Sequence, residues 1–136
     1  MTVPYDFREA KDACARASRA QIEAERDLAQ AAQDHAAKEQ AFRVALAKQI
    51  VTLHDEGLAW TVCQDVARGD KDVARLRYER DVAHGVLEAQ QQRAWRHTAD
   101  RKDVLELVRW SARVSPDGQY DPPLGSNVSV IGGRRS

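Results

Sequence analysis

Proline and glycine are almost absent from two long stretches of this chain. Residues 6–56 contain neither, and residues 70–114 contain no proline and a single glycine, Gly85. Because proline breaks the interior of a helix and glycine weakens it, this absence permits helices of unusual length. The first stretch is dominated by alanine, glutamate, glutamine, arginine and lysine, which are good helix formers. The sequence therefore predicts two long helices, at about 6–56 and 70–114.

Cysteine is scarce as well. Cys14 and Cys63 lie far apart, and neither has a second thiol or a histidine at metal-binding spacing. This excludes a disulfide framework and a zinc site. The histidines show no HExxH or similar spacing, although His35 and His97 occupy inward-facing positions where they can meet across a hairpin. We expect free thiols in a reducing cytosol, no metal and no cofactor.

Long apolar runs, net charge and catalytic motifs are also missing. No window approaches the ~18 uninterrupted apolar residues of a membrane-spanning helix, and the first residues lack the pattern of a standard secretion signal. Lys plus Arg and Asp plus Glu number 21 each, so no global field attracts nucleic acid or an anionic membrane. There is no GxSxG and no phosphate-cradling glycine loop. A non-enzymatic protein without membrane association is predicted.

The piece between the two long helices predicts a tight connection. Residues 61–68 form a short helix with Thr61 as its N-cap and Gly69 in the left-handed conformation at its end, and Asp70 caps the second long helix. The predicted fold is all-α: residues 1–114 form one domain, a long antiparallel helical hairpin with a short connecting helix. Residues 115–136, rich in proline, glycine and serine, are predicted to be an extended or disordered, flexible tail.

Apolar and small residues recur at steps of three and four along both long helices. In the first helix this stripe is small up to residue 35 and bulky from Phe42 onward, so we expect most hydrophobic stabilisation near the turn. In the second helix Gly85 marks either a close approach of the helices or a tolerated defect. The stripes are Ala10, Cys14, Ala17, Gln21, Ala24, Leu28, Ala31, His35, Phe42, Leu46, Ile50 and Leu53, and then Leu76, Arg80, Ala83, Leu87, Gln90, Ala94, His97, Arg101, Val104 and Val108.

A hairpin of two such helices is thin, and its alanines bury little area. Several larger apolar residues fall outside the stripes and are candidates for a second apolar flank. We therefore expect a coiled-coil-like homo-oligomer, a dimer or a tetramer. These residues are Tyr78, Val82, Trp95, Leu107 and Trp110.

Arginines of the second helix are the best candidates for a binding site. Arg80 and Arg101 fall on the otherwise apolar stripe, where an unpaired charge is costly, so each needs an acid such as Glu25, an acid of another subunit or an anionic ligand. Guanidinium groups suit phosphates, and an aromatic beside them can stack on a base. The simpler interpretation pairs these arginines with acids on the helix surface. The secondary candidates are Arg77, Arg93, Arg96, Trp95 and Tyr78.

The stretch AWTVCQDVARGDKDVARLRYERDVA, which begins at Ala59, resembles part of a group of small bacteriophage early-region helical proteins. In that group a short helix ends in a Gly-Asp step, before a second long helix that opens with a Val-Ala, Arg-Tyr, Asp-Val-Ala pattern. The likeness covers about residues 20–110. It implies a phage origin, a location in the cytoplasm of the bacterial host, and an accessory role in recombination on single strands or in countering host defence.

Three functions stay open. The leading hypothesis is a phage-type binding protein that counteracts host defence by capturing a host protein or an anionic small molecule such as a nucleotide signal. The second is an accessory protein for recombination of single-stranded nucleic acid, which the neutral net charge disfavours. The third is a purely structural coiled-coil assembly protein.

Overall fold

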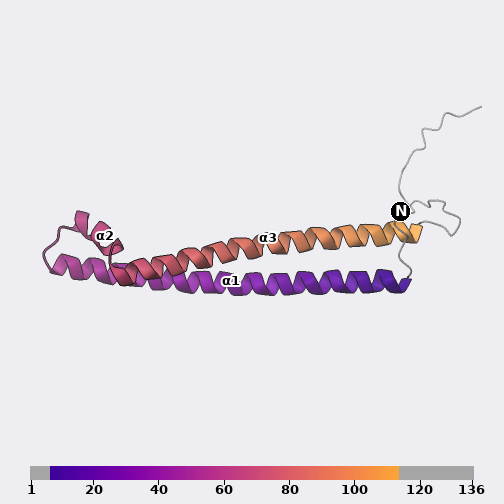
Figure 1. Ribbon diagram of the computed structural model, residues 1–136, viewed down its shortest axis with the longest axis horizontal. Coiled ribbons are helices and arrows are strands. Elements are labelled where there is room, and N and C mark those ends of the chain that lie inside the picture. Colours follow the sequence, from indigo (N-terminus) through magenta and orange to yellow (C-terminus); the bar gives the residue numbers. More distant parts are fainter. Residues whose placement is uncertain (1–6, 114–136) are drawn as a thin grey trace, which may run out of the picture.

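Two long helices lie side by side in opposite directions, and a short helix stands beside the turn that joins them (Figure 1). The computed structural model describes residues 7–113, which form helices α1 (Phe7–Asp55), α2 (Trp60–Arg68) and α3 (Lys71–Arg113). The all-α fold is confirmed, and each helix ends within one residue of its predicted boundary. The predicted tail, 115–136, lies outside the described residues.

Polar pairs across the α1–α3 seam show one antiparallel register over most of its length. Glu39 of α1 lies opposite Arg80, Asp27 lies opposite Arg93, and Gln21 bonds to Thr98 nearer the open end. The inward-facing residues of α3 follow alternating steps of three and four, which is the repeat of a left-handed coiled coil. From Val73 to His97 every position of this repeat is at least partly buried.

The core is thin and unevenly distributed. Of the nine buried apolar residues in the described part of the chain, five are alanines, and in α1 Ala13, Ala24 and Ala31 precede the larger Phe42 and Leu53. At the turn, Leu53, Cys63 and Ala67 form a buried cluster, against which three further side chains pack from α1 and the turn. The prediction that bulky packing concentrates near the turn is confirmed. These three side chains are Leu46, Ile50 and Leu58.

Gly57 ends α1 with a Schellman motif. Its φ of 103° lies in the left-handed region, which costs glycine little. The Leu58 amide donates to the Leu53 carbonyl, and the Gly57 amide donates to the His54 carbonyl. Leu58 also packs on the cluster that contains Leu53, which supplies the apolar contact that accompanies this motif. The chain therefore reverses at a position where its sequence has the required glycine.

The prediction of a cap at Thr61 was wrong. α2 begins at Trp60, and the cap position is held by Ala59, whose carbonyl accepts bonds from the Val62 and Cys63 amides. The Trp60 ring stacks on the His54 ring, with 3.5 Å between centroids and 15° between planes. This stacking draws Trp60 into the first turn of α2, so that Thr61 lies inside the helix.

The prediction of a left-handed Gly69 was also wrong, because its φ and ψ are −83° and −6°. The next residue, Asp70, caps α3 as expected: its Oδ2 accepts from the amides of Asp72 and Val73 at 3.1 and 3.2 Å. Since Asp70 can begin a new helix directly after this turn, no left-handed residue is needed between α2 and α3.

Gly85 does not mark a close approach of helices. A Cβ built at this position meets nothing within 4 Å outside the helix backbone nearby. The tolerated-defect interpretation therefore remains.

Replacing Gly85 with alanine is expected to raise the free energy of unfolding by about 1 kcal/mol, because the helix gains propensity at no steric cost. Gly57→Ala is the opposing control, and it should lower stability by about 1–2 kcal/mol because its φ is left-handed. Urea unfolding followed by circular dichroism at one protein concentration measures both. Equal effects at the two positions would contradict this account.

Asp70→Ala is expected to lower stability by about 1 kcal/mol, because two amides of α3 lose their acceptor. Thr61→Ala, at the position predicted as a cap but not used as one, should change stability by less than about half of that. The same urea titration compares them, and a larger loss at Thr61 would show that the cap of α2 is wrongly placed.

Candidate functional site

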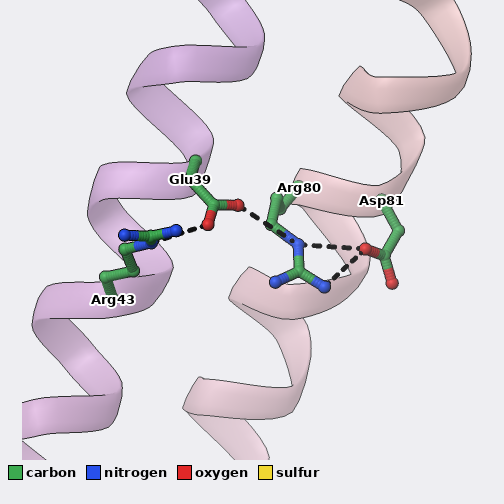
Figure 2. A network of polar contacts seen from close by, with 4 residues as sticks. All are labelled: Glu39, Arg43, Arg80 and Asp81. Carbon is green, nitrogen blue, oxygen red and sulfur yellow. Dashed lines mark hydrogen bonds and ion pairs between the residues drawn. The ribbon is translucent and has the colours of Figure 1, made fainter.

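Arg80, the leading candidate for a ligand-binding residue, is engaged inside the hairpin (Figure 2). Its Nε lies 3.5 Å from Glu39 Oε2 of α1, and its terminal nitrogen donates to Asp81 Oδ1 at 2.7 Å. The guanidinium carbon lies 4.5 Å from the centroid of the Phe42 ring, a cation–π distance. Only 22% of the side chain is exposed. The acid it was expected to need comes from α1, but the acid is Glu39, not Glu25.

Glu39 joins two arginines into one network. It accepts from Arg43 Nε at 2.7 Å and faces Arg80 across the seam, as Figure 2 shows. The hydrogen bond from Arg43 is the largest cause that lowers the pKa of Glu39. Desolvation opposes it, and the charges of Arg43, Arg80 and His35 lower the pKa further. Acid and base therefore alternate from Arg43 to Asp81, and the network is internally neutral.

Two other predicted arginines are also partnered. Arg93 donates to Asp27 Oδ2 of α1 at 2.6 Å and to Gln90 Oε1 at 3.2 Å. Arg101 is exposed despite its place on the stripe, and it donates to Gln21 Oε1 at 3.4 Å. These contacts tie α3 to α1, and their partners are an acid and an amide of α1, not the acids on the surface of α3 that the simpler interpretation named.

The remaining predicted residues are solvent-facing. Arg77 and Arg96 are exposed and make no ion pair within residues 7–113, and Tyr78 and Trp95 are 70% and 60% exposed. Tyr78 and Trp95 are 17 positions apart, which at about 100° per residue turns their side chains roughly 100° away from each other around α3 and sets them about 25 Å apart along it.

One copy of the chain does not gather the seven predicted residues. Arg80 and Arg101 are 21 positions apart on one helix, a separation of about 30 Å at 1.5 Å per residue. The structure therefore brings together Arg80 with Glu39 and Phe42, and Arg93 with Asp27, but no single pocket for a small anion forms from Arg80 and Arg101.

A groove between α1 and α3 contains Tyr78 and Val82 of the predicted second apolar flank, and its α1 side is the part that sequence reasoning missed. Its volume is about 460 Å³, and Tyr78, Val82 and Val86 of α3 form one wall of it. Two shallower hollows continue it along α1: one shares Ala37 with the groove, and the next shares Lys48 with the first hollow. We call this continuous surface the α1 groove. Its lining residues on α1 are Ala31, Asp34, Ala37, Lys38, Gln40, Ala41, Val44, Ala45, Ala47, Lys48, Val51 and Thr52.

A sequence signal for the groove exists, although the main stripes conceal it. Asp34, Ala37, Ala41, Val44, Lys48 and Val51 follow the same steps of three and four as the seam, displaced by one residue. One residue corresponds to about 100° around a helix, so this second stripe lies to one side of the seam with α3. All six residues are exposed.

The histidines meet differently from the prediction. His35 lies beside His84, with 5.2 Å between ring centroids, and His97 does not lie across from it. The register explains the difference, because α3 residue 84 is the one opposite α1 residue 35. His84 Nε2 also lies 3.1 Å from Glu88 Oε1. Among the described residues no three His, Cys, Asp or Glu side chains are grouped to hold a metal ion.

The described helices also lack any apolar stretch long enough to cross a bilayer.

Glu39→Gln is expected to remove a pH-dependent part of the stability. A carboxylate whose pKa is lowered in the folded state stabilises above its ordinary pKa of 4.5 and loses this effect as the pH falls through the lowered value. The difference in unfolding free energy between the parent chain and the variant should therefore be full at neutral pH and shrink below about pH 4.5.

Arg43→Ala is the companion variant, since it removes the main hydrogen bond that lowers this pKa. It should weaken the same acid-sensitive difference, and added salt should reduce it further. Urea titrations between pH 3 and 7 measure the effect; a difference that does not vary with pH would contradict the role given to Glu39.

Comparison with protein-family models, with curated proteins and with solved structures finds no match to this chain.

Proposed function

We propose that this chain is a non-enzymatic assembly protein that acts through helix–helix contacts along its hairpin. The observation that carries this proposal is the distribution of large apolar side chains. Among the described residues eleven of them are exposed, whereas only Phe42, Leu53 and Val73 are both large and buried. Five of them, Val44, Val51, Tyr78, Val82 and Val86, line the α1 groove, and a contiguous exposed apolar surface is typical of protein interaction sites. A helical partner is the natural complement of the α1 groove.

The pairing of arginines inside the hairpin favours this function over capture of an anionic ligand. Arg80 donates to Asp81 and faces Glu39, and Arg93 donates to Asp27. A phosphate at either arginine would have to displace a carboxylate that is already in contact. The nucleotide-capture version therefore depends on Arg77, Arg96 and Arg101, which are exposed and make no ion pair within residues 7–113.

The phage setting that the sequence resemblance implies is compatible with this proposal. An assembly protein would counter host defence by contacting a host protein, with no reaction required. This role rests on the resemblance.

Binding of single strands is the second candidate. Trp95 and Arg96 are adjacent and both exposed, which is an arrangement that suits base stacking beside a positive charge. The neutral net charge gives no long-range attraction for a nucleic acid.

The assembly function predicts that purified protein at micromolar concentration has a mass by light scattering that is a multiple of 15.2 kDa and falls on dilution. A strictly monomeric particle over the whole range would overturn the proposal. A panel of nucleotides should leave the melting temperature unchanged. A nucleotide that did bind, present at 100 times its Kd, would stabilise the protein by ~2.7 kcal/mol and raise the melting temperature.

Single-strand oligonucleotide is the matched second ligand. If the protein binds the oligonucleotide at low salt, and if added salt weakens this binding and Trp95→Ala abolishes it, the single-strand function is favoured instead.

A further inference from the structure

The second stripe of α1 is complementary to itself. It begins with an acid, Asp34, has Ala41 at its centre and continues to a base, Lys48. Asp34 and Lys48 each lie seven residues from Ala41, which is two helical turns or about 10 Å. An antiparallel second copy of α1 that meets the first at Ala41 places each Asp34 opposite the Lys48 of its partner.

Both charged groups are available for such a contact. Lys48 Nζ makes no ion pair within residues 7–113. The hydrogen bond between Thr52 and Lys48 involves the backbone carbonyl of Lys48 and not its side chain. Asp34 accepts from Gln30 through Oδ1, which leaves Oδ2 for a cation. Two symmetric pairs of opposite charge would fix the direction of approach, since a parallel arrangement sets like charges against each other.

The shape of the groove fits the same arrangement. In an antiparallel pair centred on Ala41, the residues opposite Ala37, Lys38 and Ala31 of one copy are those near Val44 and Val51 of the other. Ala31, Ala37 and Lys38 line the 460 Å³ groove together with Tyr78, Val82 and Val86. Val44 and Val51 are 46% and 51% exposed, so both are accessible to the groove of a second copy. The small Ala41 permits the two α1 helices to approach closely where they cross.

We propose that two copies of this chain associate through the α1 groove, antiparallel and two-fold symmetric about Ala41, as a four-helix assembly. This inference rests on the proposed assembly function and specifies its partner, surface and register. In it, Val44 and Val51 of each copy occupy the groove beside Tyr78, Val82 and Val86 of the other, and Asp34 pairs with Lys48 across the interface.

Disulfide trapping tests the register. In full-length protein carrying Cys14→Ser, the variant Ala41→Cys places two thiols beside the two-fold axis, within the distance that a disulfide spans. Mild oxidation should convert most of it to a covalent dimer on non-reducing electrophoresis. The matched control is Ala32→Cys, also exposed and nine residues earlier, on the opposite side of α1; it should cross-link at least about tenfold more slowly.

Charge reversal tests the pairing independently. Asp34→Lys and Lys48→Asp should each weaken dimerisation by about tenfold, because each sets two like-charge pairs across the interface. The double variant restores opposite charges and should recover most of the affinity. Sedimentation at several concentrations measures the dimer constant, and circular dichroism checks that the helices are intact.

The outcomes separate this inference from the function on which it rests. A dimer in which Ala41→Cys cross-links no faster than Ala32→Cys, or in which the double variant is no better than either single one, would overturn the surface and leave the assembly function standing. A protein that stays monomeric at all concentrations would overturn both. Rapid trapping at Ala41 together with recovery in the double variant would support the inference.

Discussion

The rest of this structure depends on one constraint: a two-helix hairpin buries only a single stripe of each helix. Every other surface of α1 and α3 remains open to solvent. In this chain the buried stripe contains mostly alanine toward the open end, as at Ala24, Ala31 and Ala94. Alanine allows the helices to lie close together but removes little apolar area from water. The hairpin therefore combines a well-defined register with a small hydrophobic core.

Polar contacts between α1 and α3 add to the alignment of the helices that this small core provides. The pairs Glu39–Arg80 and Asp27–Arg93 join α1 to α3 at separate levels, and the Phe42 ring supports the Arg80 guanidinium from below. Exposed and half-exposed ion pairs contribute little stability each. Their value here is in orientation, because a slip of the helices by one turn would separate acids from bases at several levels at once. Arginine on an apolar stripe is thus explained by the hairpin itself.

The sequence was sufficient for the architecture because the relevant signals were local. The absence of proline and glycine, the glycine at position 57 and the acid at position 70 determine where the helices begin and end. Predictions failed where a tertiary contact decided the outcome. The stacking of Trp60 on His54 moved the start of α2, and the exact register paired His35 with His84 instead of His97. The seven candidate residues were chosen by type and spacing along α3, which contains no information on the acids of α1. The α1 side of the groove between α1 and α3 was missed because its stripe, offset by one residue, contains alanines that look like ordinary helix formers.

The uneven core gives the hairpin a mechanical polarity. At one end the backbone itself joins α1 to α3 through α2. This end contains the Schellman turn, the cap at Asp70 and the larger side chains of the cluster around Leu53 and Cys63. The opposite end has neither a covalent connection between α1 and α3 nor a bulky cluster of this kind within the described residues. Thermal opening should consequently start at the open end of the hairpin and proceed toward the turn. Amide protons should exchange fastest at the open end and slowest beside the turn. The open ends of α1 and α3 can separate without a change of register, because the packed turn keeps the two helices aligned and they can pair again as before.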